Sequence, residues 1–314
     1  MENRRTFLGK SAAACLALCL PVGSGCAPTT KVSVPMKTTE PKNARVLWYS
    51  QTGNTRRVGQ AIAAQLRDGG LTVEASDYRR TDVSALGGSD LIVLGSSVMY
   101  ADVPVNLRSW LEELPNIEGT AVGSFVTFGG PGDGQRHTAA ALSKLAAKRG
   151  GVPVGMDMFG AMSTFAPTWS LGNTKRILAY RDLPSAETYQ RARAFARGLL
   201  ARVETGESVA ITDEFSKATI MRALPQVALI KRVITGHGVD RDLCIDCGSC
   251  VRSCPASAID PMAGTLDRGR CVACLGCINN CPAGAVTMSF MGKPVYGWPQ
   301  FLARNEITIL EPEA

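Results

Sequence analysis

The sequence has little histidine and few aromatic residues, and it lacks the motifs of several common enzyme classes. His137 and His237 are the only histidines among 314 residues, and aromatic residues make up 6% of the chain. Both histidines stand in glycine-rich surroundings, and the sequence assigns neither of them a role. Neither a GxGxxG fingerprint nor a complete P-loop motif occurs, which disfavours dinucleotides and nucleoside triphosphates as ligands. No nucleophile triad or acid–base pair is visible either.

Long apolar runs and a strong charge imbalance are also missing. The apolar run at residues 12–20 is too short to span a bilayer as a mature helix. Lys and Arg number 34 against 27 Asp and Glu, which gives a net charge of +7. Part of this excess comes from the N-terminus and from residues 206–238. We therefore expect no nucleic-acid partner.

Cysteine is abundant, and its spacing is the most informative feature of the chain. Eight of the eleven cysteines form two runs with the spacing CxxCxxCxxxCP, which begin at Cys244 and Cys271. Thiols crowded into one short turn are unlike a disulfide scaffold. A structural zinc site remains an alternative, but it explains neither the third cysteine of each run nor the following proline. The spacing favours iron–sulfur clusters.

The two runs closely resemble dicluster bacterial ferredoxins, and the similarity covers residues 240–288 with the pseudo-repeat CPASAID and CPAGAVT. This resemblance implies a small α+β domain with two [4Fe-4S] clusters, in which the fourth cysteine of each run binds the other cluster. The segment carries five acids against four arginines, so its charge does not steer it strongly toward a basic partner. One cluster is expected on Cys244, Cys247, Cys250 and Cys281, and the other on Cys271, Cys274, Cys277 and Cys254.

The N-terminus has the pattern of an export signal. Arg4 and Arg5 precede the apolar run, and small residues follow it at positions 23–26. The stretch NRRTFLGK resembles the twin-arginine signal, whose pathway exports proteins already folded with their cofactors. We therefore expect the protein in the periplasm or anchored to the outer face of the cytoplasmic membrane.

Cys26 and the residues after it bear on anchoring. Cys26 follows Gly23-Ser24-Gly25, which resembles a lipoprotein processing site, and ordinary cleavage nearby is the alternative. Residues 27–43 are rich in Thr, Lys, Pro and Ser without an apolar period, so they are predicted to be a tether after the signal at residues 1–26.

A predicted anion site follows the tether. Residues 46–49 are a short apolar run typical of a strand, and Val58, Ile62 and Leu66 recur at helical spacing. The polar loop between them leads into a helix N-terminus, where free backbone N–H groups and the helix dipole attract anions. Gly53 permits close backbone approach. The residues of this loop are Ser50, Gln51, Thr52, Gly53, Asn54 and Thr55.

Strand and helix patterns alternate through residues 44–205. Strand-like segments at residues 71–79, 90–95 and 121–130 are interleaved with helical ones, and a last helix near residues 188–203 closes the domain. This alternation predicts an α/β fold with a doubly wound parallel sheet, whose ligand lies at the carboxyl ends of the strands.

The same region resembles flavodoxin over residues 44–203. The stretch YSQTGNT matches the family's phosphate loop, which implies FMN with its phosphate at residues 50–55. GSSVMYAD corresponds to the loop beside the isoalloxazine ring, where Tyr100 is a candidate for stacking on the ring. Within the family, GSSVMYADVPVNLRSWLEEL is most similar to the flavodoxin-like protoporphyrinogen oxidases. The implied ring and third-loop residues are Ser96, Ser97, Val98, Met99, Tyr100, Gly129 and Gly130.

Residues 206–238 are predicted to be a basic connector, residues 239–290 the ferredoxin domain, and residues 291–314 a C-terminal tail. The connector contains Lys217, Arg222, Lys231 and Arg232, with apolar residues at helical spacing around Pro225. Packing between the two domains is its expected role, and resting on a membrane or a partner is the alternative.

The order of the two domains resembles a family of flavodoxin–ferredoxin fusion proteins. FMN takes one or two electrons and each cluster carries one, so the sequence predicts an exported electron carrier. The alternative is a flavin-dependent oxidoreductase, such as a quinone-linked protoporphyrinogen oxidase. The expected partners are a redox protein, as donor or acceptor, and a quinone.

Overall fold

The computed structural model describes residues 34–130, 132–212, 219–220 and 223–313. The predicted export signal at residues 1–26, including Cys26, lies outside the described residues, as do the first residues of the tether and Lys217 and Arg222 of the connector. No helix within the described part of the chain is long and apolar enough to cross a membrane.

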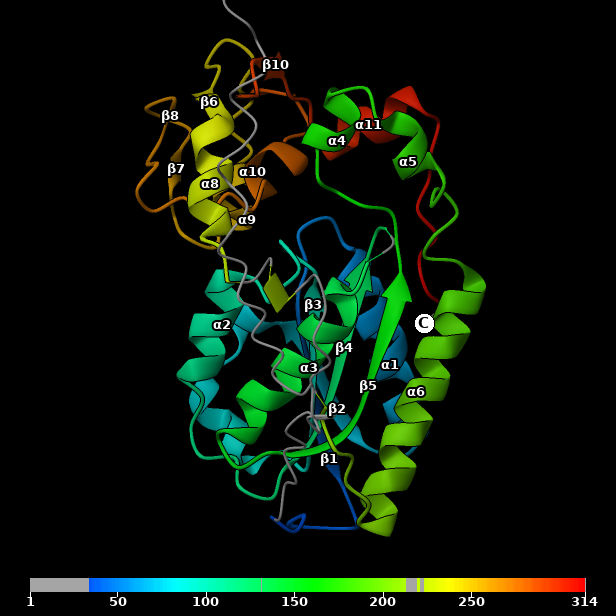
Figure 1. Ribbon diagram of the computed structural model, residues 1–314. Coiled ribbons are helices and arrows are strands. Elements are labelled where there is room, and N and C mark those ends of the chain that lie inside the picture. The colour runs from blue at the N-terminus through cyan, green and yellow to red at the C-terminus, as the bar shows by residue number, and fades with distance from the viewer. Residues whose placement is uncertain (1–33, 131, 213–218, 221–222, 314) are drawn as a thin grey trace, which may run out of the picture.

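A five-stranded parallel sheet forms the N-terminal domain (Figure 1). Its order is β2-β1-β3-β4-β5, so the chain reverses its winding direction between β1 and β3. All loops that follow the strands therefore meet at the carboxyl edge of the sheet, where doubly wound folds bind ligands. The order and direction are those of the predicted flavodoxin-like α/β fold. The strands are β1 (Asn43–Tyr49), β2 (Thr72–Asp77), β3 (Leu91–Ser97), β4 (Ala121–Phe128) and β5 (Val152–Gly160).

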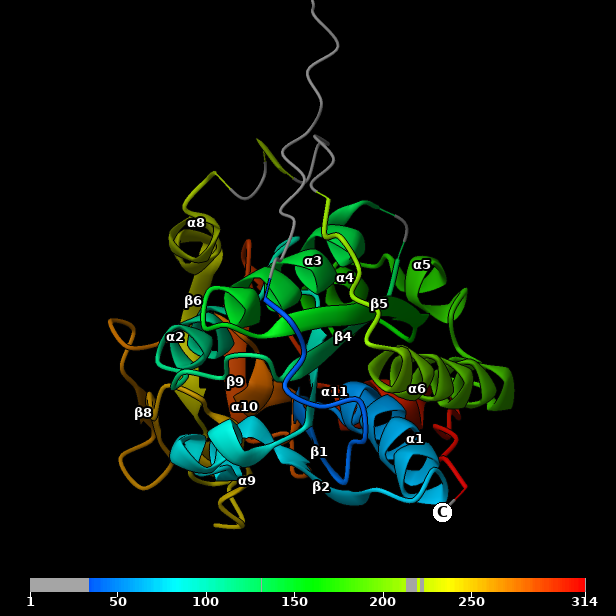
Figure 2. The same ribbon diagram turned by 90° about the horizontal axis from the view of Figure 1, so that it is seen from below.

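Helices cover both faces of this sheet (Figure 2). On one face, α1 (Asn54–Asp68) and α6 (Ala186–Thr205) bury a core that includes Ile62 and Leu199. On the other face, α2 (Val105–Glu112) and α3 (Gly134–Ala147) pack over their own core. The central strands β3 and β4 are buried along nearly their whole length, as parallel strands covered on both faces must be.

The segment between β5 and α6 leaves the sheet and joins the C-terminal half of the chain. It carries the short helices α4 (Pro167–Ser170) and α5 (Thr174–Leu178). Trp169 is buried against Trp298 and Phe301, with its ring centroid 4.5 Å from that of Phe301. Its indole nitrogen donates to the carbonyl oxygen of Tyr296 at 3.0 Å. This segment and the C-terminal half share one hydrophobic core.

The C-terminal domain lies at the carboxyl edge of the parallel sheet (Figure 1). One antiparallel sheet has the strand order β10-β9-β6, and β7 pairs with β8 in a hairpin. Two short helices, α9 and α10, follow the cysteine-rich loops. The elements are β6 (Ile234–Val239), α9 (Ser249–Ser253), β7 (Ile259–Asp260), β8 (Thr265–Leu266), α10 (Gly276–Asn279), β9 (Val286–Phe290) and β10 (Lys293–Pro294).

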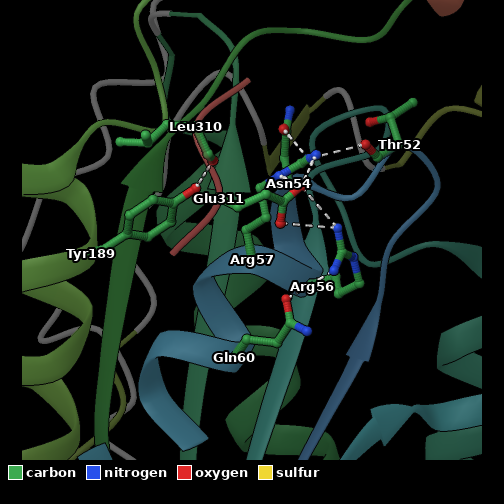
Figure 3. A network of polar contacts seen from close by, with 8 residues as sticks. All are labelled: Thr52, Asn54, Arg56, Arg57, Gln60, Tyr189, Leu310 and Glu311. Atoms are coloured by element: carbon green, nitrogen blue, oxygen red, sulfur yellow. Dashed lines mark hydrogen bonds and ion pairs between the residues drawn. The ribbon is translucent and has the colours of Figure 1, made fainter. Parts of the chain in front are cut away.

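The predicted connector and tail take part in this domain. The connector contains α8 (Gln226–Val233), which starts directly after Pro225, and it supplies β6, which pairs with β9. The tail adds β10 and α11 (Trp298–Arg304). Its last residues then return to the N-terminal domain beside α1 and α6 (Figure 3).

Candidate functional site

The loop between β1 and α1 has the features of an anion cradle. Gly53 adopts φ 94°, in the left-handed region, directly before the first turn of α1, and no side chain caps this helix. Ser50 Oγ is buried and has no hydrogen-bond partner among the described residues. Thr55 Oγ1 lies 2.8 Å from Thr127 Oγ1, which ties the loop to the end of β4. A buried hydroxyl without a partner beside free helix N–H groups fits a phosphate oxygen.

The loop after β3 forms a tight turn at the same edge. Met99 and Asp102 exchange two backbone hydrogen bonds of 3.0 and 2.9 Å, and the two residues between them both have positive φ, 53° at Tyr100 and 62° at Ala101. Such strain in residues other than glycine gathers at functional loops. The hydroxyl of Tyr100 donates to the carbonyl oxygen of Ala273 at 2.7 Å. This bond joins the predicted flavin loop to the second cysteine run.

One cavity of about 330 Å³ collects most of the predicted FMN residues. Its size lies within the range of roughly 300–1,000 Å³ that is usual for small-molecule sites. Of the predicted residues, Gly53, Ser96 and Gly130 do not line it. Ser96 is buried in β3, and its hydroxyl donates to the carbonyl oxygen of Ser97. Those that do line it are Ser50, Gln51, Thr52, Asn54, Thr55, Ser97, Val98, Met99, Tyr100 and Gly129.

Residues 161–165 complete the cavity, and the sequence predictions missed them. They follow β5 at the carboxyl edge, a position that could have identified them once the strand was recognised. Asn54 Nδ2 donates to the carbonyl oxygen of Met162 at 3.1 Å. A Cβ on Gly129 would lie 2.2 Å from the backbone nitrogen of Ser163, so this close approach requires glycine.

The first group of thiols gathers at the end of the C-terminal domain near α9. Burial raises the pKa of Cys250, and the thiols of Cys281 and Cys244 add to that shift. Cys281, from the second run, therefore lies with the first run. Cys247 is exposed, and the hydroxyl and backbone of Ser249 lower the pKa of its thiol.

The second group lies against the N-terminal domain. Burial raises the pKa of Cys274 to about 11, with smaller contributions from Cys254 and Cys271. Cys277 is also buried, and its pKa is raised well above the usual value by burial, then by Cys274, Cys271 and Cys254. The thiols of Cys254, Cys271, Cys274 and Cys277 therefore act on one another, and Cys281 acts with Cys244 on Cys250.

Within the described residues, no group of three or more His, Cys, Asp or Glu side chains converges on a position for a single metal ion. The donor set of each group is four thiols, which fits a [4Fe-4S] cluster.

The cavity and the second thiol group share a wall. Cys274 and Leu275 line the cavity directly. Behind them, burial and the neighbouring Cys274 thiol raise the pKa of Tyr49 well above its usual value. Tyr49 also accepts a hydrogen bond of 2.8 Å from Gln51 Nε2. The predicted phosphate loop, flavin loop and cluster loop therefore meet at one place.

One of the two histidines reaches the second thiol group, which the sequence did not predict. His237 Nε2 lies 3.2 Å from Cys277 Sγ. Burial, assisted by Arg268, lowers the pKa of His237 to about 4, so the ring is neutral at physiological pH and can donate Nε2–H to the sulfur. His137 is buried in α3, and its Nε2 lies 3.4 Å from Thr219 Oγ1.

Comparison with known proteins finds relatives for both halves of the chain. Residues 237–260 match the family described as 4Fe-4S binding domain. A flavodoxin from Clostridium saccharobutylicum is 29% identical over 85 residues, which are 26% of this chain and 53% of that protein. The chain thus matches about half the length of this curated relative.

Solved flavodoxin structures are also similar. An archaeal flavodoxin is 15% identical, with a TM-score of 0.40, and the similarity covers 52% of this chain and 99% of that one. A flavodoxin from Streptococcus pneumonia is 18% identical, with a TM-score of 0.40, over 51% of this chain and 98% of that one.

Proposed function

We propose, from the premise that this chain is a fusion of a flavodoxin-like domain with a 4Fe-4S ferredoxin domain, that it relays electrons between FMN and two [4Fe-4S] clusters. The single observation that carries the proposal is the shared wall, where Cys274 lines the cavity beside Tyr100 and Ser50. A redox protein, as donor or acceptor, completes the proposed path. Electron transfer is the function that the two domains support together.

The residues around the cavity fit FMN. The N–H groups at the start of α1 and the unpaired hydroxyl of Ser50 would hold the phosphate, and residues 97–100 would flank the ring. FMN, when bound, supplies one- and two-electron chemistry. The chain's part is to hold that group beside the second thiol set and to exclude water from the contact, because Cys274 and Leu275 are buried there.

Two clusters are proposed because each of two thiol groups contains four cysteines. The cysteines of the second group are held in an environment that disfavours bare thiolates, since burial raises the pKa of Cys274 and Cys277. A bound cluster offsets this cost by neutralising the thiolate charge. Anaerobically purified protein is expected to contain about eight irons and one FMN per chain.

Export by a twin-arginine route, to the periplasm or the outer face of the cytoplasmic membrane, is part of the proposal. It is motivated by Arg4 and Arg5 before a short apolar run, and by a fold whose cofactors must be inserted before transport. Replacing both arginines with Lys is expected to leave folded, cofactor-loaded protein in the cytoplasm. Cleavage with or without a lipid on Cys26 would then be read from the mass of the mature N-terminus.

The relay is tested by reducing FMN rapidly in the loaded protein under anaerobic conditions and following the cluster absorbance. Cluster reduction is expected to be first order, with a rate that does not change with protein concentration. In full-length protein carrying Cys271→Ala and Cys274→Ala, FMN reduction should persist while transfer to the clusters is lost. A rate proportional to protein concentration would reject transfer within one molecule. Undiminished oxidation of a porphyrinogen substrate by that variant would favour the alternative, a flavin-dependent oxidase.

A further inference from the structure

A second cavity of about 450 Å³ lies next to the first one, between α8, the start of α2 and the second cysteine run. Met99, Tyr100 and Cys274 line both cavities, so these three residues form the partition between them. The partition is fixed from two sides, because Gln226 Nε2 donates to the carbonyl oxygen of Tyr100 at 3.0 Å and the hydroxyl of Tyr100 donates to Ala273. A molecule in this second cavity would touch a predicted cluster ligand.

The walls of this second cavity are mainly apolar. Val103 and Pro104 face it from the N-terminal domain, while Val227 and Ala228 of α8 and Val272 of the cluster loop face it from the other side. Such walls, together with a volume in the range of small-molecule sites, suit a ring system better than an extended polar chain.

Its polar groups include one buried acceptor that a ligand hydroxyl could satisfy. Asn106 Nδ2 donates to the hydroxyl of Tyr78 at 2.7 Å, but its Oδ1 is buried and has no partner among the described residues. Arg108 is neutralised by Asp102 at 2.7 Å, and Lys231 donates to the carbonyl oxygen of Gly269 at 3.3 Å. The Arg108 guanidinium is thus already paired, the Lys231 ammonium keeps its positive charge, and a ligand hydroxyl would satisfy Asn106 Oδ1.

Some of the apolar side chains that line the cavity are also partly exposed to solvent. Val105 and Leu224 both line the cavity, and they are 50% and 47% exposed. An apolar substituent leaving the cavity would cover these side chains and gain by removing them from water.

We infer that this second cavity is a binding site for an aromatic hydroxyl compound of the hydroquinone class, with its ring between Val103 and Val227 and a hydroxyl on Asn106. Oxidation of a bound hydroquinone to the quinone releases two electrons and two protons. The two proposed clusters, when bound, would accept one electron each, and the two protons would leave to solvent. This redox role rests on the proposed function, whereas the binding site does not depend on it.

Binding is tested on the full chain loaded with FMN and iron, by anaerobic equilibrium dialysis against 1-naphthol, a redox-stable ring with one hydroxyl. We expect the unaltered chain to bind one molecule of 1-naphthol at saturation. A Val227→Trp variant, in which the larger side chain fills the cavity, should bind it at least tenfold more weakly. The amount that this variant retains is the background. Leu171→Trp is the matched control, because Leu171 is 40% exposed and lies outside both cavities. FMN and iron contents are measured in every sample.

A second pair of probes tests the hydroxyl contact. Asn106→Leu is expected to weaken 1-naphthol binding several-fold and to leave the binding of 1-methoxynaphthalene, which cannot donate, nearly unchanged. Equal affinity of Val227→Trp and the unaltered chain, or an absence of saturable binding, overturns the inference. If 1-naphthol does not bind but electrons still pass from FMN to the clusters in the same sample, only the inferred binding site is rejected. If 1-naphthol binds but no electrons pass, the proposed relay is rejected and the binding site stands.

Discussion

At the scale of single residues, His237 is the clearest addition to the cluster site. Its neutral ring can donate to Cys277 Sγ at 3.2 Å, and hydrogen bonds to cluster sulfurs raise the reduction potential. His237→Phe removes the donor at a similar ring size. We expect the potential of the cluster on Cys277 to become more negative, as measured by titration followed by electron paramagnetic resonance.

The second cluster of the same molecule provides the control for His237→Phe. Within the described residues, His237 makes no hydrogen bond to that cluster's proposed ligands, so the cluster's potential should hardly move. These ligands are Cys244, Cys247, Cys250 and Cys281. A His237→Gln variant retains an N–H donor and should recover part of the shift. Equal shifts of both clusters would indicate a general disturbance and contradict the assignment.

The crossed ligands give a second prediction at this scale. Cys254 acts electrostatically on Cys271, Cys274 and Cys277, the three thiols of the other run. Cys254→Ala is therefore expected to damage the cluster on the second run, seen as selective loss of its magnetic resonance signal. Cys281→Ala is the matched variant and should affect the first run, because Cys281 acts on Cys250. The opposite pattern would show that each run binds its own cluster.

At the scale of elements, the sequence could predict the parts of the site that depend on the spacing of residues within one short segment. The cysteine runs and the loop of residues 50–55 are contiguous motifs whose chemistry depends on residues close in the chain, and Cys274 of the second run lies with that loop at the first cavity. His237 and residues 161–165 carry no such motif. Their positions depend on β6 pairing with β9 and on the exit of the chain from β5, which are long-range contacts.

The C-terminal tail is another long-range element, and it contacts the start of α1 (Figure 3). Glu311 pairs with Arg57 at 2.6 Å and with Arg56 at 3.3 Å, while Tyr189 donates to the carbonyl oxygen of Leu310. Cations in the first turn of a helix oppose its dipole. Glu311 supplies the compensating negative charge beside the predicted phosphate loop.

Glu311→Gln is expected to loosen the first turn of α1. An exposed pair at a helix terminus contributes about 0.5–1 kcal/mol, so amide hydrogen exchange in this turn should rise by about two- to fivefold at low salt. The difference should shrink at high salt because the ions screen the pair. Glu313→Gln removes the same charge from the same tail. Within the described residues Glu313 accepts a hydrogen bond from Arg193 through its backbone oxygen and makes no side-chain ion pair, so this control should leave α1 unchanged.

At the scale of the whole molecule, the two domains interlock more than their order in sequence suggests. The residues between β5 and α6 belong to the flavodoxin-like half of the chain, yet they are buried in the core of the other half. The tail contacts α1 in return. The sequence predicts domains at residues 44–205 and 239–290. These boundaries divide the chain into consecutive segments, but the hydrophobic core contains residues from both segments.

This interlocking predicts that the flavodoxin-like half is incomplete alone. A chain ending after residue 212 would expose Trp169 and Ile177, which are 2% and 1% exposed in the full protein. Exposing such side chains costs about 1.5–3 kcal/mol each. It would also free residues 161–165, which line the first cavity. We expect the truncated chain to bind a hydrophobic dye and to hold FMN at least tenfold more weakly, as measured by flavin fluorescence.

Trp169→Gln separates exposure of this surface from an unrelated folding failure. In the truncated chain, where Trp169 has lost Trp298 and Phe301, the substitution should reduce dye binding and aggregation. In the full chain the same substitution should lower the melting temperature, because it removes a buried ring and its bond to Tyr296. Opposite effects of one substitution in the two chains are expected only if the C-terminal domain covers this surface. Destabilisation of both chains, with FMN affinity undiminished by truncation, would mean that the flavin half folds and functions by itself.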